Sequence, residues 1–447
     1  MTNFLPRLGV VMLAVLAAQP VQAGVITASD IFSQFNAVVF NSFNTTSGVA
    51  GRSVIGGSLT GSAATFLTNP LGEAASTFGA LSVYGSVTST ATYKVDNGGT
   101  VAVQGNNTAG FSFASGGSIQ IGGTNKGALT LTNGTDSVAI GATNSGAIQV
   151  AGGSVYIGAN RGKLTANGNA AVSINGNNTA SVILNNGGSV ALNGSTSAAI
   201  TVNGSGSVTY TGPSSKNSSK ISINGQHTGT HVSTLALTAP PSTLSSFATT
   251  FQTPLKDLST QLDTLTANSV ATVAGKAITF KATPSSPGGL AVFDFTASLF
   301  NNASTVTIDL GNASSAIINV NVAGSYHFPT GLKFQNPTSY ADKVLWNFVN
   351  ASAITFGTEF GGTVLAPNAA VTNNSPIDGT LVASSYSGKA AITNYSYTGS
   401  LSLTQTTTTG GQTAAVPEPA SLLVLSGAIS GLGVLRRRRF VRARRGA

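Results

Sequence analysis

Histidine and carboxylate side chains are the groups in this sequence that could most readily bind a metal or transfer protons. His227 and His231 are four residues apart, a spacing that places two imidazoles on one helix face and suits a zinc site. Gly225 and Gly229 lie beside and between them and disfavour a helix. With His327 far along the chain, surface histidines are the simpler interpretation, and we predict no metal site.

Carboxylates are scattered through the second half of the chain without a visible pairing. A glycoside hydrolase needs two of them across one bond, and calcium-binding coil repeats need aspartates in each repeat. The region from 100 to 210 contains only Asp136, and its glycine runs lack the lysine of a phosphate-binding loop. We therefore predict no catalytic residue and no cofactor, and expect that the chain is not an enzyme. Carboxylates that the fold could still bring together are Asp294, Asp309, Asp342, Glu359 and Asp378.

Short apolar triplets dominate the region from Thr100 to Tyr210, which is otherwise rich in Gly, Asn, Ser and Thr. The outer two residues of a triplet are apolar and the middle one is usually small or polar, the alternation of a half-buried strand. Two series interleave, and successive starts within each are 16 to 19 residues apart. A disordered linker has no reason to keep such an interval. The first series starts at Val101, Ile119, Val138, Val155, Val172, Val190 and Val208, and the second at Phe111, Leu129, Ile148, Leu164, Val182 and Ile200.

This period predicts an all-β protein, a β-solenoid (parallel β-helix) of about 18 residues per coil. Two strands per coil, joined at Asn-Gly and Gly-Gly corners, would stack at about 4.8 Å. Columns of Val, Ile and Leu then fill an interior that no single coil could bury alone. Antiparallel hairpins would show the same local alternation, but the regular coil length favours the solenoid.

One or two helices are expected to pack on the side of this solenoid. Apolar residues recur every three or four positions between 242 and 267, with Pro254 inside the run, so we expect two abutting helices with Thr253 capping the second. A shorter helix near residue 30 has Ser29 as its expected cap. From 277 to 402 strand patterns return. The polar side of the longer helix, expected to face solvent, comprises Lys256, Ser259 and Asp263.

The ends of the chain carry most of its net charge of +9. Seven arginines fall within the last twelve residues, whereas residues 24–416 contain 13 basic and 11 acidic side chains. The basic composition therefore gives no reason to predict a nucleic-acid partner.

Residues 1–23 are typical of a secretory signal peptide. Arg7 precedes an apolar run from Leu8 to Ala18, and small residues precede a cleavage site between Ala23 and Gly24. An uncleaved membrane anchor is the alternative, but the run is short for a span. We expect recognition by the export machinery, and without cysteine the exported chain depends on burial and backbone pairing for stability.

The C-terminal region 417–447 has three parts in order. Pro417, Glu418 and Pro419 precede an apolar transmembrane segment, 420–435, and a cluster that would hold its end in the cytoplasm. The cluster is Arg436, Arg437, Arg438 and Arg439. An ordinary tail anchor would also contain the last two parts. The full order resembles the PEP-CTERM sorting signal, and the resemblance implies removal of the tail by exosortase and delivery to the cell surface or extracellular matrix.

A second resemblance involves both edges of the region 24–405, which a linker, 406–416, separates from the tail. The segments Phe35–Leu59 and Gly362–Ser385 are similar to those of the choice-of-anchor A family, whose members share an extracellular domain and differ in their sorting tails. The resemblance is thin between these edges and implies no established catalytic site.

Three classes of function are compatible with these features. A structural or adhesive protein of the surface or biofilm matrix accounts best for the sorting signals and the lack of a reactive cluster. A module that binds extracellular polysaccharide or ice is the alternative, because a solenoid with a lateral helix resembles ice-binding adhesins and Thr-bearing faces can order water. The outward triplet positions contain no unbroken threonine column, however. A surface hydrolase is the third class, and a buried carboxylate pair in a cleft would favour it.

Overall fold

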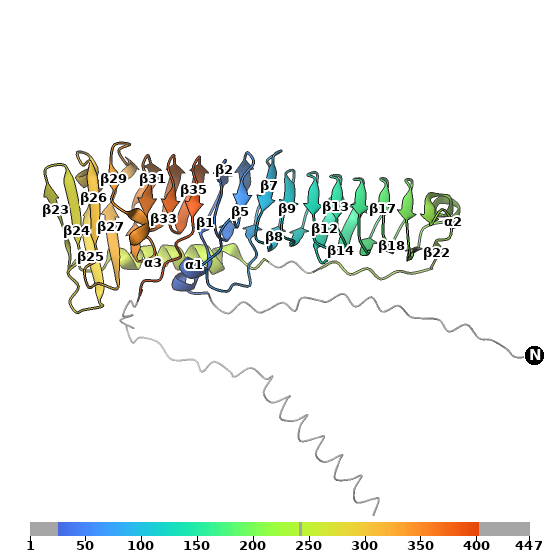
Figure 1. The fold of residues 1–447 in the computed structure, drawn as a ribbon, viewed down its shortest axis with the longest axis horizontal. Coiled ribbons are helices and arrows are strands. Elements are labelled where there is room, and N and C mark those ends of the chain that lie inside the picture. The colour runs from blue at the N-terminus through green and yellow to red at the C-terminus, as the bar shows by residue number, and fades with distance from the viewer. Residues whose placement is uncertain (1–25, 241–243, 402–447) are drawn as a thin grey trace, which may run out of the picture. The chain divides into compact units, whose positions relative to one another are not determined.

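The structure is a computed structural model that describes residues 26–240 and 244–401. These residues belong to one structural unit, which ends at Leu401. Nearly all of its strands pair in parallel and stack coil upon coil (Figure 1). The predicted β-solenoid is therefore confirmed, and the antiparallel alternative is wrong for the repeat region.

Each predicted triplet forms a strand of one of two parallel sheets. First-series triplets lie in sheet A and second-series triplets in sheet B. Val155 pairs with Val172 one coil further on, as the register predicts, and both are buried. The sheet A strands up to residue 231 are β1 (Ala37–Val39), β2 (Phe43–Thr45), β3 (Ser53–Ile55), β4 (Leu59–Gly61), β6 (Leu81–Val83), β8 (Thr100–Val103), β10 (Ser118–Ile121), β12 (Ser137–Asn144), β14 (Gly153–Asn160), β16 (Ala170–Ile174), β18 (Gly188–Leu192), β20 (Gly206–Tyr210) and β22 (Thr230–His231). Those of sheet B are β5 (Thr65–Phe66), β7 (Thr92–Val95), β9 (Gly110–Phe113), β11 (Leu129–Leu131), β13 (Ile148–Val150), β15 (Leu164–Ala166), β17 (Val182–Leu184), β19 (Ile200–Val202) and β21 (Ile221–Ile223).

Glycine supplies the tight corners that lead into sheet A. Gly117 and Gly188 have φ of +153° and +117°, a region that residues with a Cβ rarely adopt. A Cβ at Gly188 would also lie 2.3 Å from the carbonyl oxygen of Ala170 in the coil before. These positions therefore need glycine for both backbone conformation and coil stacking.

A third side of the coil contains an internal ladder of asparagines that we did not predict. Its members are fully or almost fully buried and join neighbouring coils by single backbone bridges. Each side-chain amide donates to the next member at 2.7–3.0 Å. The ladder consists of Asn107, Asn125, Asn144, Asn160, Asn178 and Thr196. Because each buried amide finds its hydrogen-bond partner in the next coil, the ladder fixes the register of successive coils on a side that has no column of apolar side chains.

The order of the coils in space differs from their order in the sequence. Strand β1 pairs with β3 on one side and with β35 (Leu381–Gly388) on the other, so that Val38 lies between Val54 and Val382. The first coil is thus followed by coils on both of its sides. We call the part that begins with this coil the first arm (37–231) and the part on its other side the second arm (270–393) (Figure 1). Asn36 connects the two arms, because its amide donates to the carbonyls of Gly379 and Thr393 and accepts from the N–H of Gly51.

The second arm continues both sheets and ends in a small sheet with one antiparallel pair. Its sheet A strands are β25 (Leu290–Thr296), β27 (Ser315–Asn321), β28 (Gly324–His327), β30 (Val344–Asn347), β31 (Ala351–Phe356), β33 (Thr363–Asn373) and β35. The others are β23 (Val270–Ala274), β24 (Ala277–Lys281), β26 (Thr305–Asp309), β29 (Lys333–Phe334), β32 (Phe360–Gly361), β34 (Ile377–Asp378) and β36 (Ile392–Thr393). Strands β33 and β35 pair at an offset of 17 residues, Val364 with Leu381, close to the coil length of the first arm.

The long helix and α1 lie on the outer face of sheet A, as expected, but their limits and caps differ from the prediction. The long helix runs from 248 to 263, not from 242 to 267, as a π-helix (Ala248–Gln252) continuing into α3 (Thr253–Asp263). Thr253 is inside the helix and caps nothing. Pro254 lacks an N–H and would clash with the carbonyl four residues before it, and the wider π turn accommodates it. The other helices are α1 (Ala28–Gln34), α2 (Ser214–Asn217) and the 3₁₀ turns Ser218–Lys220, Ala297–Phe300 and Pro337–Ser339.

Two further polar predictions on the helices are wrong. Thr27, not Ser29, caps α1, in a reciprocal capping box with Asp30. Ser259 is buried rather than exposed. Its hydroxyl faces sheet A and donates a hydrogen bond of 2.6 Å to the side-chain oxygen of Asn347 in β30. The sheet beneath α3 contains buried amides that need polar partners, and Ser259 supplies one.

Candidate binding surface

The histidines do not form a metal site. His227 donates from Nδ1 to the carbonyl oxygen of Ile221 at 2.7 Å, and the ring of His231 packs edge-on against Tyr210. His327 is exposed on β28. Within residues 26–240 and 244–401, no cluster of three or more His, Cys, Asp or Glu could hold a metal ion.

Two of the carboxylates that the fold could still bring together, Glu359 and Asp378, do lie close to each other. The hydroxyl of Thr393 donates to Oδ1 of Asp378. Asp378 is buried, and its Oδ2 has no donor in the described part of the chain, so the adjacent Glu359 could donate to it only when protonated. Burial raises the pKa of Glu359, and the adjacent Asp378 raises it further. The hydroxyl of Tyr340 is buried near both carboxylates. Burial is the main cause that raises the pKa of Tyr340, and the charges of Asp378 and Glu359 raise it further.

This pair predicts a pH dependence of stability. Folding raises the pKa of Glu359, so its protonated form stabilises the folded protein. This stabilisation is complete below the pKa of the unfolded state, 4.5, and is lost as the pH rises through the pKa of the folded state. Glu359→Gln keeps a donor toward Asp378 at every pH, so its melting temperature should fall less between pH 4 and pH 8 than that of the unmodified protein. The exposed Asp309→Asn is the matched control. Parallel melting curves for all three proteins would contradict the shared-proton interpretation.

One ion pair in the described region is structural. Arg52 donates to Glu73 through Nη1 at 2.9 Å and through its backbone N–H at 2.7 Å. Burial raises the pKa of Glu73 to about 7, against the lowering effect of these two interactions. The pair fixes the loop after β5 to the start of β3 and is not arranged for catalysis.

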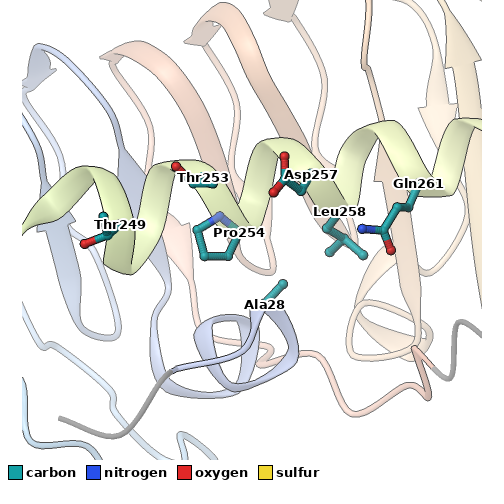
Figure 2. Close-up of a pocket in the computed structure, with 7 residues that line it drawn as sticks. All are labelled: Ala28, Thr249, Thr253, Pro254, Asp257, Leu258 and Gln261. Carbon is teal, nitrogen blue, oxygen red and sulfur yellow. The ribbon is translucent and has the colours of Figure 1, made fainter. Parts of the chain in front are cut away.

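A groove of about 410 Å³ lies between α1 and the long helix (Figure 2). In Figure 2, Pro254, Leu258 and Gln261 lie on the side of the helix toward Ala28 of α1. The remaining lining residues are Thr249, Thr253 and Asp257. The lining includes one carboxylate but no histidine, lysine or cysteine, so the groove lacks the paired nucleophile and base of an active site.

The outer face of sheet A is occupied by the chain itself. Leu255, Leu258 and Leu262 of α3 are buried, and α3 packs on β27, β30 and β33 of the second arm and on α1. The segment before the helix runs along the first arm (Figure 1), where the carbonyl of Pro240 accepts a hydrogen bond from Gln120. Phe247 packs on Tyr84. The outer face of sheet A is therefore covered, and its strands do not present a regular array to a ligand.

The outer face of sheet B presents regular columns of polar side chains, and we call this face the sheet B surface. Its central column has hydroxyls interrupted by Gln149 and Ile183. The hydroxyls of Thr130, Thr165 and Thr201 form no hydrogen bond within the described residues, so they are available to a ligand. The column is Ser112, Thr130, Gln149, Thr165, Ile183, Thr201 and Ser222.

An exposed column of amides borders this central column. Asn185 donates to Asn167 at 2.8 Å, and Asn224 exchanges hydrogen bonds with the backbone of Gly204. These contacts hold the amides in place at the coil spacing of about 4.8 Å. The surface therefore combines ordered amides with free hydroxyls, a combination that suits hydrogen bonding to a repetitive, hydroxyl-rich partner.

The residues predicted for export and sorting lie outside the described residues. They are Ala23, Gly24, Pro417, Glu418, Pro419, Arg436, Arg437, Arg438 and Arg439. In the part of the chain that is described, no helix has the length and hydrophobicity needed to cross a membrane.

The sequence matches a protein family over residues 141–394. The description of this family is "Putative Ice-binding-like adhesive domain". The chain belongs to this family. The match covers more than half of the chain and runs from β12 of the first arm to β36 of the second. An adhesive domain of this kind acts outside the cell or on its surface.

Two solved structures have a distant likeness to this adhesive-domain protein. An ice-binding protein from an Antarctic bacterium of the Flavobacteriaceae is 14% identical, with a TM-score of 0.22, over 85% of this chain and 100% of that chain. The tapirin C-terminal domain of Caldicellulosiruptor kristjanssonii is 11% identical, with a TM-score of 0.18, over 82% and 94%. No curated protein matches the sequence.

Proposed function

We propose that this chain is an exported, non-catalytic surface adhesin that binds polysaccharide through the sheet B surface. The observation that carries the proposal is the central column, in which Thr130, Thr165 and Thr201 present hydroxyls without an internal partner. Their spacing follows the coil repeat, and a polysaccharide offers hydroxyls that repeat along its chain. Each hydrogen bond would contribute about 0.5–1.5 kcal/mol, so several in register give useful affinity.

Ice is a second candidate ligand, and the description of the family favours it. A flat array of threonines suits ordered water, but Gln149 and Ile183 interrupt the array here. The amides along its border match sugar hydroxyls as readily as water. For these reasons we place polysaccharide before ice.

A direct survey of ligands tests this proposal. The purified full chain is incubated with insoluble neutral polysaccharides, with extracellular matrix from a biofilm and with growing ice, and the bound fraction is measured for each. We expect retention on polysaccharide or matrix and little or no effect on ice growth. Binding to ice alone would make ice the ligand, and no binding to any of the three would refute the proposed function.

The route to the surface is part of the proposal. Cleavage between Ala23 and Gly24 would follow export, and the region 417–447 would then be read by an exosortase-type enzyme. Assignment to the choice-of-anchor A family finds support in the fold, because the two similar segments, 35–59 and 362–385, meet where β1 pairs with β35. On this proposal, residues 24–405 form the solenoid domain and 406–416 the linker.

A single substitution separates a sorting signal from a plain tail anchor. An anchor depends on the apolar run, so Glu418→Ala should leave it unchanged, whereas a sorting enzyme must recognise the motif itself. We expect Glu418→Ala to leave uncleaved precursor in the inner membrane, while Thr413→Ala, outside the motif, is processed normally. Mass spectrometry of the C-terminal peptide gives the result. Surface protein that still contains Arg436–Ala447 would contradict cleavage.

A further inference from the structure

The charges of the solenoid are segregated although their sum is small. Residues 97–231 contain five basic side chains and one acidic side chain, a balance of +4. The acidic one, Asp136, is buried and accepts from the N–H groups of Gly117 and Asn133 at 2.8 Å. The remaining described residues contain eight basic and ten acidic side chains, a balance of −2. Residues 97–231, the part of the first arm far from the second arm, therefore present only positive charge at the surface.

Three of these cations lie together beside the sheet B surface. Lys126 and Arg161 each follow a member of the asparagine ladder, Asn125 and Asn160, and are therefore two coils apart, or about 10 Å. Lys163 directly precedes β15, two residues before Thr165. We call these three residues the cationic edge.

The cationic edge is free to bind an anion. Lys126, Arg161 and Lys163 are all exposed, and the ion pair found in the described residues is the distant Arg52–Glu73. The backbone under the edge is fixed, because the N–H of Lys126 donates to Asn107 and that of Arg161 to Asn144, at 2.8 and 2.7 Å. Three cations on an ordered scaffold, in a region (97–231) whose acidic side chain, Asp136, is buried, attract a polyanion.

We propose that the cationic edge binds the carboxylates of an acidic polysaccharide while neutral parts of the same polymer lie on the sheet B surface; this inference rests on the proposed function and specifies its substrate class. Lysine and arginine form charge-assisted hydrogen bonds with carboxylates. A uronate polymer carries a carboxylate on each sugar, so its charges repeat along the polymer as the cations of the edge repeat along the solenoid. Duplex DNA fits less well, since it carries a charge about every 1.7 Å and needs many more cations.

The test compares polygalacturonate with its neutral methyl ester, so that the two probes differ in charge but not in backbone. Binding of the full chain is measured at low and high salt. The triple variant Lys126→Gln, Arg161→Gln, Lys163→Gln removes the edge. Lys276→Gln, Lys281→Gln, Lys333→Gln removes the same charge from exposed positions of the second arm and is the matched control. Circular dichroism confirms that both variants fold.

We expect the edge variant to bind polygalacturonate about tenfold more weakly, since each exposed ionic contact is worth about 0.5 kcal/mol and the three add. Its binding to the ester should be unchanged, the control should behave like the unmodified chain, and salt should weaken only binding to the acid. Equal binding of the unmodified chain to acid and ester, or equal losses in both variants, would overturn the inference and leave the proposed function in place. Tighter binding to duplex DNA than to polygalacturonate would also overturn it. No binding to either polymer would overturn the inference too, and the survey of neutral polysaccharides, matrix and ice then decides the proposed function separately.

Discussion

Asn144→Asp should destabilise the first arm by about 3 kcal/mol or more. The amide of Asn144 donates to the carbonyl of Gly146 and to Oδ1 of Asn160, and its Oδ1 accepts from Asn125. The substitution conserves volume but places a carboxylate oxygen against two acceptors at a fully buried site. Each unsatisfied buried polar group costs about 1–3 kcal/mol, and a buried charge costs more.

Urea unfolding followed by circular dichroism measures this loss. Asn203→Asp, the same change at an exposed position of the same arm, is the control and should alter stability by less than about 0.5 kcal/mol. Comparable losses in the two variants would mean that the ladder contributes nothing specific to coil stacking.

Ile148→Asp should have the largest effect of any single change proposed for this protein, about 5 kcal/mol. Ile148 is 1% exposed and lies in the inward column of sheet B between Leu129 and Leu164. The change removes about 1.5–3 kcal/mol of apolar burial and leaves a carboxylate unpaired in the core. Because the whole stability of a domain is about 5–15 kcal/mol, we expect the repeat coils to unfold or to melt tens of degrees lower.

The neighbouring residue supplies the control for this prediction. Gln149 follows Ile148 in β13 but points outward and is exposed. Gln149→Asp should therefore shift the melting temperature by no more than a few degrees. Losses of similar size at 148 and 149 would show that the assignment of inward and outward positions in sheet B is wrong.

The repeat coils could be predicted because their signal is local and periodic. Triplets such as Val155–Ile157 and Val172–Ile174 combine strand alternation with a constant interval, and together these determine both the strand and its partner. The position of the first coil, with coils on both of its sides, could not be predicted in this way. Val38 and Val382 are paired across almost the whole chain, and no period connects them.

The members of the asparagine ladder recur at a constant position in the sequence of each coil. Each member stands four residues before a second-series strand, as Asn107 does before Phe111 and Asn125 before Leu129. Asparagine is usually a turn residue and seldom buried, so its type alone does not predict a buried position. A polar residue at constant phase in every coil is better explained by stacking along the solenoid.

The errors at polar residues have a common physical origin. Ser259 was expected to face solvent because it lies between apolar positions of a helix, but Asn319 and Asn347 beneath it form a buried polar network. Glu359 and Asp378 are 19 residues apart, close to one coil, so coil stacking brings them together. In both cases the partner lies on the next layer of the structure, which a one-dimensional pattern does not reveal.

The central claim, that the sheet B surface is the adhesive face, is tested most directly by removing its free hydroxyls. The variant Thr130→Val, Thr165→Val, Thr201→Val keeps the size and branching of these side chains. The control variant Thr124→Val, Thr143→Val, Thr307→Val makes the same change away from the sheet B surface. Binding of each full chain to the best polysaccharide is measured at equilibrium. We predict an affinity about tenfold lower for the sheet B variant, corresponding to three lost hydrogen bonds, and unchanged affinity for the control. Unchanged affinity of the sheet B variant, or a loss confined to the control, would contradict the account.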